Sequence, residues 1–181
     1  MSETAAAVAV VEQPEEQAGD HFGTPVEVLA IVEQMGPIAL DPCSNRWSIV
    51  RARVALDGSP GQDGLSADWH ALARGGVVYV NPPYGRGKMR QWARKVLAEA
   101  KAGTEIIVLT KGDFSVKWWG TLLGAADALC YWSERIAFRG SDSGAKFPSA
   151  AWYFGHRPHL FAHVFSQVGD VRVLGSGRGA A

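Results

Sequence analysis

The strongest constraint on the fold is a pair of apolar segments separated by one amphipathic stretch. Residues 77–80 (VVYV) and 105–110 (EIIVLT) each have the length and composition of a buried strand. Between them, apolar residues recur at helical spacing across residues 89–103, and most charged side chains fall off that stripe. A strand, a helix and a second buried strand in this order predict an α/β fold with helices on both faces of the sheet.

The flanking segments extend this alternating pattern. Residues 24–35 are expected to form a helix with Thr24 as its N-cap and Pro25 at its first position, and Gly36 and Pro37 end it. Further strands are expected at residues 38–40, 51–56, 128–132, 150–154 and 171–174, and further helices at residues 116–126 and around residues 159–163.

Composition separates one folded domain, residues 21–174, from two tails. Residues 1–20 contain five acidic and no basic residues and are rich in Ala, Glu and Gln, which predicts a disordered acidic tail. Residues 175–181 (GSGRGAA) are expected to be a flexible tail. The chain after residue 20 carries 18 basic and 13 acidic residues, an excess that permits a polyanionic partner without requiring one.

The sequence predicts a cytoplasmic protein without a membrane span or a metal centre. No apolar run is long enough to cross a bilayer, and no leader with charged, apolar and small-residue regions opens the chain. Cys43 and Cys130 are the only cysteines, too few for a disulfide framework or a zinc site, and the five histidines lack metal-ligand spacing. We take a monomer as the simplest state.

Unusual polar residues follow two of the predicted strands. Residues 38–40 run into the sequence DPC (41–43), and residues 77–80 run into NPPY (81–84). In open α/β sheets, ligands bind at the carboxyl ends of the strands. Both groups of residues are therefore expected to lie at the binding edge of the sheet.

The NPPY turn has the residue types needed to hold an amino group on a planar ring. Its two prolines fix their backbone φ and lack N–H donors, so the turn is stiff and its carbonyl groups have few competing donors. The Asn81 side-chain oxygen and the Pro82 carbonyl are expected to accept both N–H bonds of the amine, while Tyr84 stacks on the ring. The nitrogen lone pair would then face an electrophile. The alternative is a proline-rich turn in which Asn81 forms the turn and Tyr84 packs partly into the core.

Together with four other short motifs, this turn resembles the phage-type DNA adenine N6-methyltransferases, the Dam-like family. The motifs lie within residues 24–154 and are TP (24–25), LDPCSN (40–45), DGL with DW (63–65 and 68–69), VYVNPPYGRG (78–87) and KFPSAAWYF (146–154). The resemblance implies a Rossmann-like fold that uses S-adenosylmethionine to methylate adenine N6 in double-stranded DNA, with the target base flipped out of the duplex. The chain departs from the wider class in having DPCSN where a Phe-x-Gly-x-Gly loop is usual.

The resemblance also implies roles for individual residues. The catalytic positions are those of the turn: Asn81, Pro82, Pro83 and Tyr84. The cofactor-binding positions come from three separate segments: Thr24, Pro25, Asp41, Pro42, Cys43, Asp63 and Leu65. Within that set, Asp41 is expected to pair with the ammonium group of the cofactor, and Cys43 to pack as a small residue rather than react. Asp57 fits either the ribose of the cofactor or a turn.

Basic residues of two segments are candidate contacts for DNA phosphates: three directly follow the turn, and two lie in a later loop that could meet the DNA from the other side. They are Arg86, Lys88, Arg90, Arg139 and Lys146. The alternative for the first three is a solvated helix start, and Trp118 and Trp119 are expected to pack rather than to form a stacking surface. Two other functions remain open: N-methylation of protein glutamine or RNA guanine by the same amine chemistry, and DNA binding by a decayed methyltransferase. The spacing of TP, DPC and FPS favours DNA methylation, and the intact NPPY argues against decay.

Overall fold

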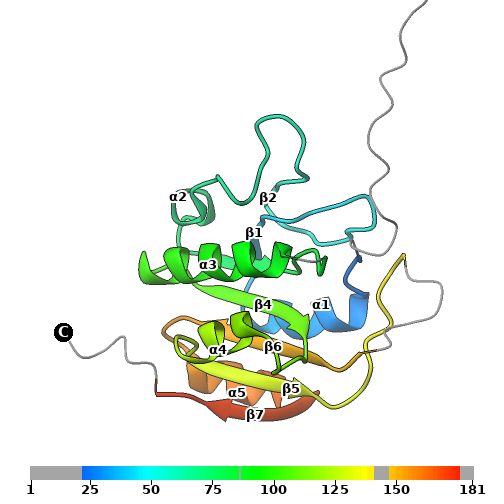
Figure 1. Ribbon diagram of the computed structural model, residues 1–181, viewed down its shortest axis with the longest axis vertical. Coiled ribbons are helices and arrows are strands. Elements are labelled where there is room, and N and C mark those ends of the chain that lie inside the picture. Colours follow the sequence, from blue (N-terminus) through cyan, green and yellow to red (C-terminus); the bar gives the residue numbers. More distant parts are fainter. Residues whose placement is uncertain (1–21, 86, 141–146, 176–181) are drawn as a thin grey trace, which may run out of the picture.

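The computed structural model describes residues 22–85, 87–140 and 147–175. Arg86, Lys146, the predicted N-terminal tail and all but the first residue of the predicted C-terminal tail lie outside these ranges. A seven-stranded sheet with the strand order β2-β1-β3-β4-β6-β5-β7 forms the centre of the molecule (Figure 1). Its strands are β1 Ile38–Asp41, β2 Val54–Ala55, β3 Val77–Val80, β4 Ile106–Lys111, β5 Ala128–Trp132, β6 Ser149–Phe154 and β7 Gly169–Val173.

The first half of the sheet is parallel and the second half is antiparallel. Strands β2, β1, β3 and β4 run in one direction, so the carboxyl ends of β1, β3 and β4 meet at one edge. Strand β6 runs the opposite way between β4 and β5, and β7 pairs antiparallel with β5. The sequence analysis placed these strands in the chain but did not predict their order or direction.

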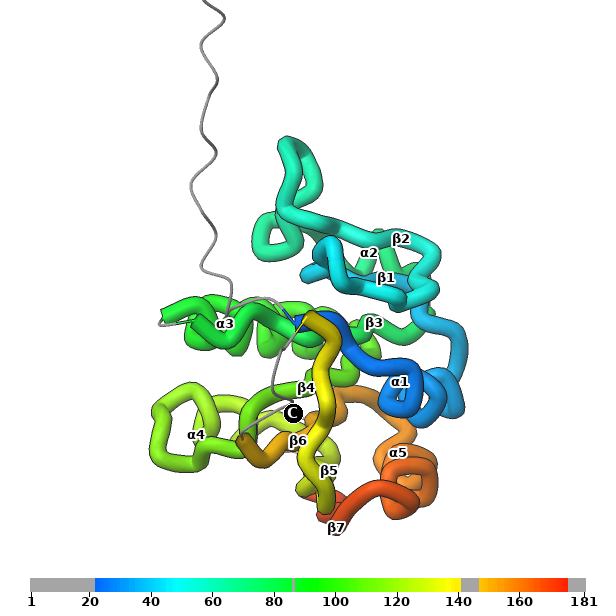
Figure 2. Tube along the Cα trace, turned by 90° about the vertical axis from the view of Figure 1, so that its right-hand side faces the viewer, coloured from blue at the N-terminus to red at the C-terminus, as the bar shows by residue number. Residues whose placement is uncertain are grey.

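Helices cover both faces of the sheet, which confirms the predicted fold class. The helices are α1 Val26–Val32, α2 Trp69–Ala73, α3 Lys88–Lys101, α4 Lys117–Leu123 and α5 Pro158–Phe165, with a short 3-10 helix Glu33–Met35 after α1. Helices α2, α3 and α4 pack on one face through three tryptophans, Trp69, Trp92 and Trp119. Helices α1 and α5 pack on the other face, and Figure 2 shows them on the opposite side of the strands from α3 and α4.

Two local predictions differ from the structure, and one helix was not predicted. Thr24 is not a helix cap: Pro25 is the N-cap of α1, no side chain caps this end, and the Thr24 hydroxyl is used elsewhere. The expected strand at residues 51–56 is reduced to the two residues of β2. Helix α2 was not predicted, although the Asp68 carboxylate caps it by accepting a hydrogen bond from the Ala71 N–H at 2.9 Å.

None of the helices in the described residues combines the length and the apolar composition that a membrane crossing requires. No group of three or more His, Cys, Asp or Glu side chains within the described ranges is arranged to hold a metal ion.

Candidate active site

Three parallel strands end in polar side chains at the same edge of the sheet. Asp41 is the last residue of β1, Asn81 directly follows β3, and Lys111 is the last residue of β4. Because these strands are neighbours and run in parallel, their last residues are brought together from distant parts of the sequence. The structure therefore brings together the two predicted strand-end groups and adds Lys111, which the sequence analysis missed.

The side-chain amide of Asn81 is held by two acceptors from the segment before α1. Its nitrogen donates to the Phe22 carbonyl oxygen at 2.9 Å and to Thr24 Oγ1 at 3.2 Å. Thr24 is buried, and its hydroxyl also lies 2.9 Å from the Tyr79 hydroxyl. With the nitrogen committed to these partners, the amide oxygen is the remaining polar atom of the side chain and can serve as an acceptor. This network, rather than helix capping, explains why a threonine stands at position 24.

The Tyr84 ring turns inward and its hydroxyl reaches Asn81. The hydroxyl donates to the Asn81 Oδ1 at 2.8 Å, and burial raises the pKa of Tyr84 well above its usual range, so it stays a donor. The ring packs edge-on against Phe138 and Phe147, with centroids 6.2 and 5.6 Å away. The Lys111 Nζ lies 5.3 Å from the centroid of the ring. Tyr84 is thus partly enclosed, as in the alternative interpretation of NPPY, but it is not a fully buried core residue.

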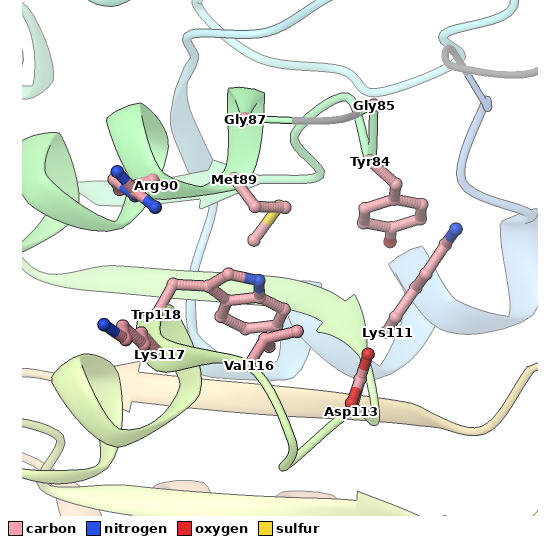
Figure 3. Close-up of a pocket in the computed structure, with 10 residues that line it drawn as sticks. All are labelled: Tyr84, Gly85, Gly87, Met89, Arg90, Lys111, Asp113, Val116, Lys117 and Trp118. Carbon is pink, nitrogen blue, oxygen red and sulfur yellow. The ribbon is translucent and has the colours of Figure 1, made fainter.

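The NPPY turn contributes to two cavities of very different size. A small cavity of about 10 Å³ is lined by Asn81, Thr24 and Asp41, together with Cys43 and Ser48. A large cavity of about 510 Å³ is lined by ten residues, which Figure 3 shows: Tyr84, Gly85, Gly87, Met89, Arg90, Lys111, Asp113, Val116, Lys117 and Trp118. One turn therefore presents its asparagine to the first cavity and its tyrosine to the second.

Asp41 is a buried carboxylate without a cationic partner among the described residues. It is 4% exposed and accepts hydrogen bonds from the Cys43 N–H at 3.1 Å and the Ser48 hydroxyl at 3.2 Å. Burial raises the pKa of Asp41 to about 6, although both hydrogen bonds act in the opposite direction. No lysine, arginine or histidine of the described ranges forms an ion pair with it. A cationic ligand in the small cavity would supply the missing charge.

Cys43 has the properties of a packing residue. Burial, followed by the negative charge of Asp41, raises the pKa of the Cys43 thiol well above its ordinary value, so the reactive thiolate is disfavoured. The thiol side chain packs against the core on the α3 face of the sheet. Both observations agree with the predicted packing role.

The segment 63–65 lies against the loop that follows β1. A Cβ atom added to Gly64 would lie 1.7 Å from the Pro42 carbonyl oxygen, so only glycine allows this close approach. The Asp63 carboxylate is exposed and accepts a hydrogen bond from the Leu65 N–H at 3.0 Å, which gives it a turn role. Asp57 likewise accepts from the Ser59 N–H at 3.0 Å. The structure thus brings Asp63 and Leu65 near Pro42, and the residue that explains the motif is Gly64.

The predicted DNA-binding residues fall into two separate places. Lys88 and Arg90 are exposed in the first turn of α3, and Arg90 lines the large cavity. Arg139 is exposed on the opposite side of the turn, where its backbone pairs with that of Gly23 and the preceding Phe138 packs against Tyr84. Lys117, which was not predicted, lines the large cavity beside Arg90.

Other residues of the large cavity also escaped the sequence analysis. Met89 and Val116 were assigned only to helices, and Trp118 to packing. Trp119 does pack in the core, whereas Trp118 packs partly against the core and also faces the cavity. A usable signal existed for Lys111, because it ends an apolar strand in the same way that Asp41 does.

The fold and the site together define a class of protein. A Rossmann-like sheet with helices on both faces, and with NPPY at the end of a central parallel strand, is the architecture of an S-adenosylmethionine-dependent methyltransferase. The model of the DNA N-6-adenine-methyltransferase (Dam) family matches residues 12–151, and the chain belongs to this family. The family consists of enzymes that methylate adenine N6 in DNA and use S-adenosylmethionine. A search of curated proteins found no match to the chain.

Proposed function

We propose that the protein methylates adenine N6 in double-stranded DNA as a monomer in the cytoplasm, and that Asn81 holds the target amine between the two cavities. The observation that supports this most directly is the fixed orientation of the Asn81 amide. Its nitrogen is bound to the segment before α1, so its oxygen is left to accept an N–H bond. An amide oxygen has two lone pairs, so it can accept the amine beside the Tyr84 hydroxyl or in its place.

The small cavity is proposed to receive the methionine end of S-adenosylmethionine. When bound, this cofactor supplies an electrophilic methyl group. Asp41 fits the cofactor because a buried carboxylate without a cationic partner is stabilised by an ammonium group. A volume of about 10 Å³ holds about one water molecule. Binding therefore requires this cavity to open on the side of the loop that carries Ser48, because moving Thr24 would break the bonds that fix the Asn81 amide.

The large cavity is proposed to receive the flipped adenine. Its volume of about 510 Å³ is ample for a nucleobase, and Tyr84, Met89 and Trp118 offer it apolar surface (Figure 3). Arg90 and Lys117 stand at the same cavity and carry the charge needed to hold the phosphates on either side of the target. The stiff proline turn keeps Asn81 and Tyr84 in fixed relative positions, which favours in-line transfer of the methyl group.

Labelled methyl transfer tests the proposal directly. The protein is incubated with methyl-labelled S-adenosylmethionine and unmethylated double-stranded DNA, and the DNA is then digested to nucleosides. We expect the label in N6-methyldeoxyadenosine. Sequencing of the product then maps the methylated site. Label in RNA or in protein glutamine instead would contradict the proposal, as would a failure to bind the cofactor. Sedimentation of the protein alone tests the monomer.

The two functions of Tyr84 can be separated by two substitutions. Tyr84→Phe removes the hydroxyl that donates to Asn81 but keeps the ring, so we expect most of the methylation rate to remain. Tyr84→Ala removes the ring from the large cavity, and a stacked base is worth about 1–3 kcal/mol, so DNA capture should weaken roughly tenfold or more. Single-turnover methylation and DNA binding are measured for both variants. Equal losses in the two would show that the hydroxyl, not the ring, is the important group.

The cations at the large cavity should control the salt dependence of DNA binding. Replacing both Arg90 and Lys117 with Ala is expected to flatten the log–log slope of affinity against salt concentration by about 0.9 for each lost phosphate contact. The matched control is the pair Arg74→Asn and Lys101→Ala. Both residues are exposed and precede β3 and β4, so they lie at the opposite edge of the sheet. An unchanged slope in the first pair, or an equal change in both, would place the DNA elsewhere.

A further inference from the structure

Phe114 is the most exposed large apolar side chain of the described residues. It lies between β4 and α4 and is 78% exposed, whereas the next such residue, Val26, is 61% exposed. An aromatic ring held in water forgoes a large burial free energy. A ring in this position suits contact with a partner rather than the packing of the free protein.

The ring is supported by the core rather than carried on a loose loop. It packs edge-on against Trp119 with centroids 6.0 Å apart, and Trp119 packs against the fully buried Trp152 at 4.5 Å. The turn itself is stabilised by Asp113, whose carboxylate accepts hydrogen bonds from the Ser115 N–H at 3.0 Å and the Ser115 hydroxyl at 2.6 Å. Phe114 is therefore presented to solvent in a defined position.

The position lies at the edge of the large cavity. Asp113 precedes Phe114 and Val116 and Trp118 follow it, and all three line that cavity opposite Tyr84 and Met89 (Figure 3). Two cations, Lys111 and Lys117, flank the same turn in the sequence and also line the cavity. An exposed ring next to a cavity of nucleobase size that two cations line matches a DNA duplex in both its apolar stack and its charged backbone.

We propose that Phe114 enters the base stack of the DNA and occupies the space that the flipped adenine leaves. The inference rests on the proposed function, since it requires the target base to lie in the large cavity. Extruding a base costs a few kcal/mol of stacking and pairing, and an inserted apolar side chain recovers part of that cost. Phe114 acts on the DNA beside the target and is a positioning residue, not a catalytic one.

Two synthetic duplexes distinguish this role from a structural one. Both contain the methylated site mapped for the parent protein; in one the target adenine is paired with thymine, and in the other it faces an abasic site and has no pair to break. We expect Phe114→Ala to lower kcat/KM about tenfold or more on the paired duplex and less than about threefold on the abasic one. Phe114→Trp keeps a ring and should restore the paired duplex. With 2-aminopurine at the target position, we expect the fluorescence increase on protein binding to be smaller for Phe114→Ala than for the parent. The increase for Phe114→Trp should match that of the parent.

The matched control is Tyr131→Ala, which removes another exposed aromatic ring, 41% exposed on β5. We expect it to leave both duplexes unchanged. Equal losses on the two duplexes for Phe114→Ala would overturn the inference, as would no loss on either. A change in sedimentation on Phe114→Ala would also overturn it, because the ring would then lie between copies of the chain. A parent protein that methylates neither duplex would instead overturn the proposed function.

Discussion

Asn81→Ala is expected to lower the single-turnover rate of methyl transfer by about 100-fold or more. The substitution removes the amide oxygen whose orientation is fixed by the hydrogen bond from the amide nitrogen to Phe22, and losing one pre-organised polar contact to a reacting group has effects of this size. Cofactor affinity should stay near that of the parent, because Asp41 and its hydrogen bonds are retained. Rates are measured with DNA and cofactor both saturating, and cofactor binding is measured separately by calorimetry.

The same substitution also removes hydrogen bonds within the protein, so folding must be measured alongside the rate. Without the amide, the Phe22 carbonyl and the Thr24 hydroxyl lose a donor, at about 1–3 kcal/mol for a buried group left unpaired. Thr24→Val disturbs the same network and leaves the acceptor of Asn81 in place, so it serves as the matched variant. A full rate in a folded Asn81→Ala protein, or an equal loss in Thr24→Val, would contradict the role of Asn81 as amine acceptor.

The edge of the sheet that holds the site could be predicted because its signals are local. Asp41 and Asn81 each follow an unbroken apolar run, and a buried strand that ends in a polar side chain is visible in the sequence alone. The helices on both faces follow from the same periodicity. The direction of β6 was not predictable, since a run of apolar residues is compatible with either direction when both faces of the strand are buried.

The contacts that orient the site depend on residues far apart in the chain, and these the sequence did not reveal. Thr24 meets Tyr79 and Asn81 across 55 and 57 residues, and a threonine before a proline has the local pattern of a helix cap. The inward turn of Tyr84 depends on Phe138 and Phe147, which come from the region before β6. The need for glycine at position 64 arises only from its approach to Pro42.

Asp41→Asn should have opposite effects on cofactor binding and on the stability of the free protein. The amide keeps the shape of the carboxylate but loses its charge, so we expect affinity for S-adenosylmethionine to fall by about 1.5–3 kcal/mol, or roughly 10- to 150-fold. In the free protein the pKa of Asp41 is raised to about 6 from the ordinary value of 3.8. The unfolded chain therefore ionises first as pH rises, and burial of this charge lowers the free energy of unfolding above pH 6 by up to about 3 kcal/mol. Removing the charge should accordingly raise Tm at pH 7.5.

The pH dependence of both quantities identifies Asp41 as the group responsible. Its destabilising effect is absent below about pH 4, grows between pH 4 and pH 6, and is complete above pH 6, so Tm of the parent and of Asp41→Asn should converge at acid pH. Cofactor affinity of the parent should decline below pH 6, by at most tenfold for each pH unit, because the ammonium binds the ionised carboxylate. The decline should be absent in Asp41→Asn.

Calorimetry measures the cofactor affinity and thermal unfolding measures Tm. Both are carried out between about pH 4.5 and pH 7.5 at intervals of about one pH unit. Unchanged affinity in a folded Asp41→Asn protein would remove Asp41 from the cofactor site, and a lower Tm at pH 7.5 would show that its hydrogen bonds to Cys43 and Ser48 outweigh the cost of burying its charge.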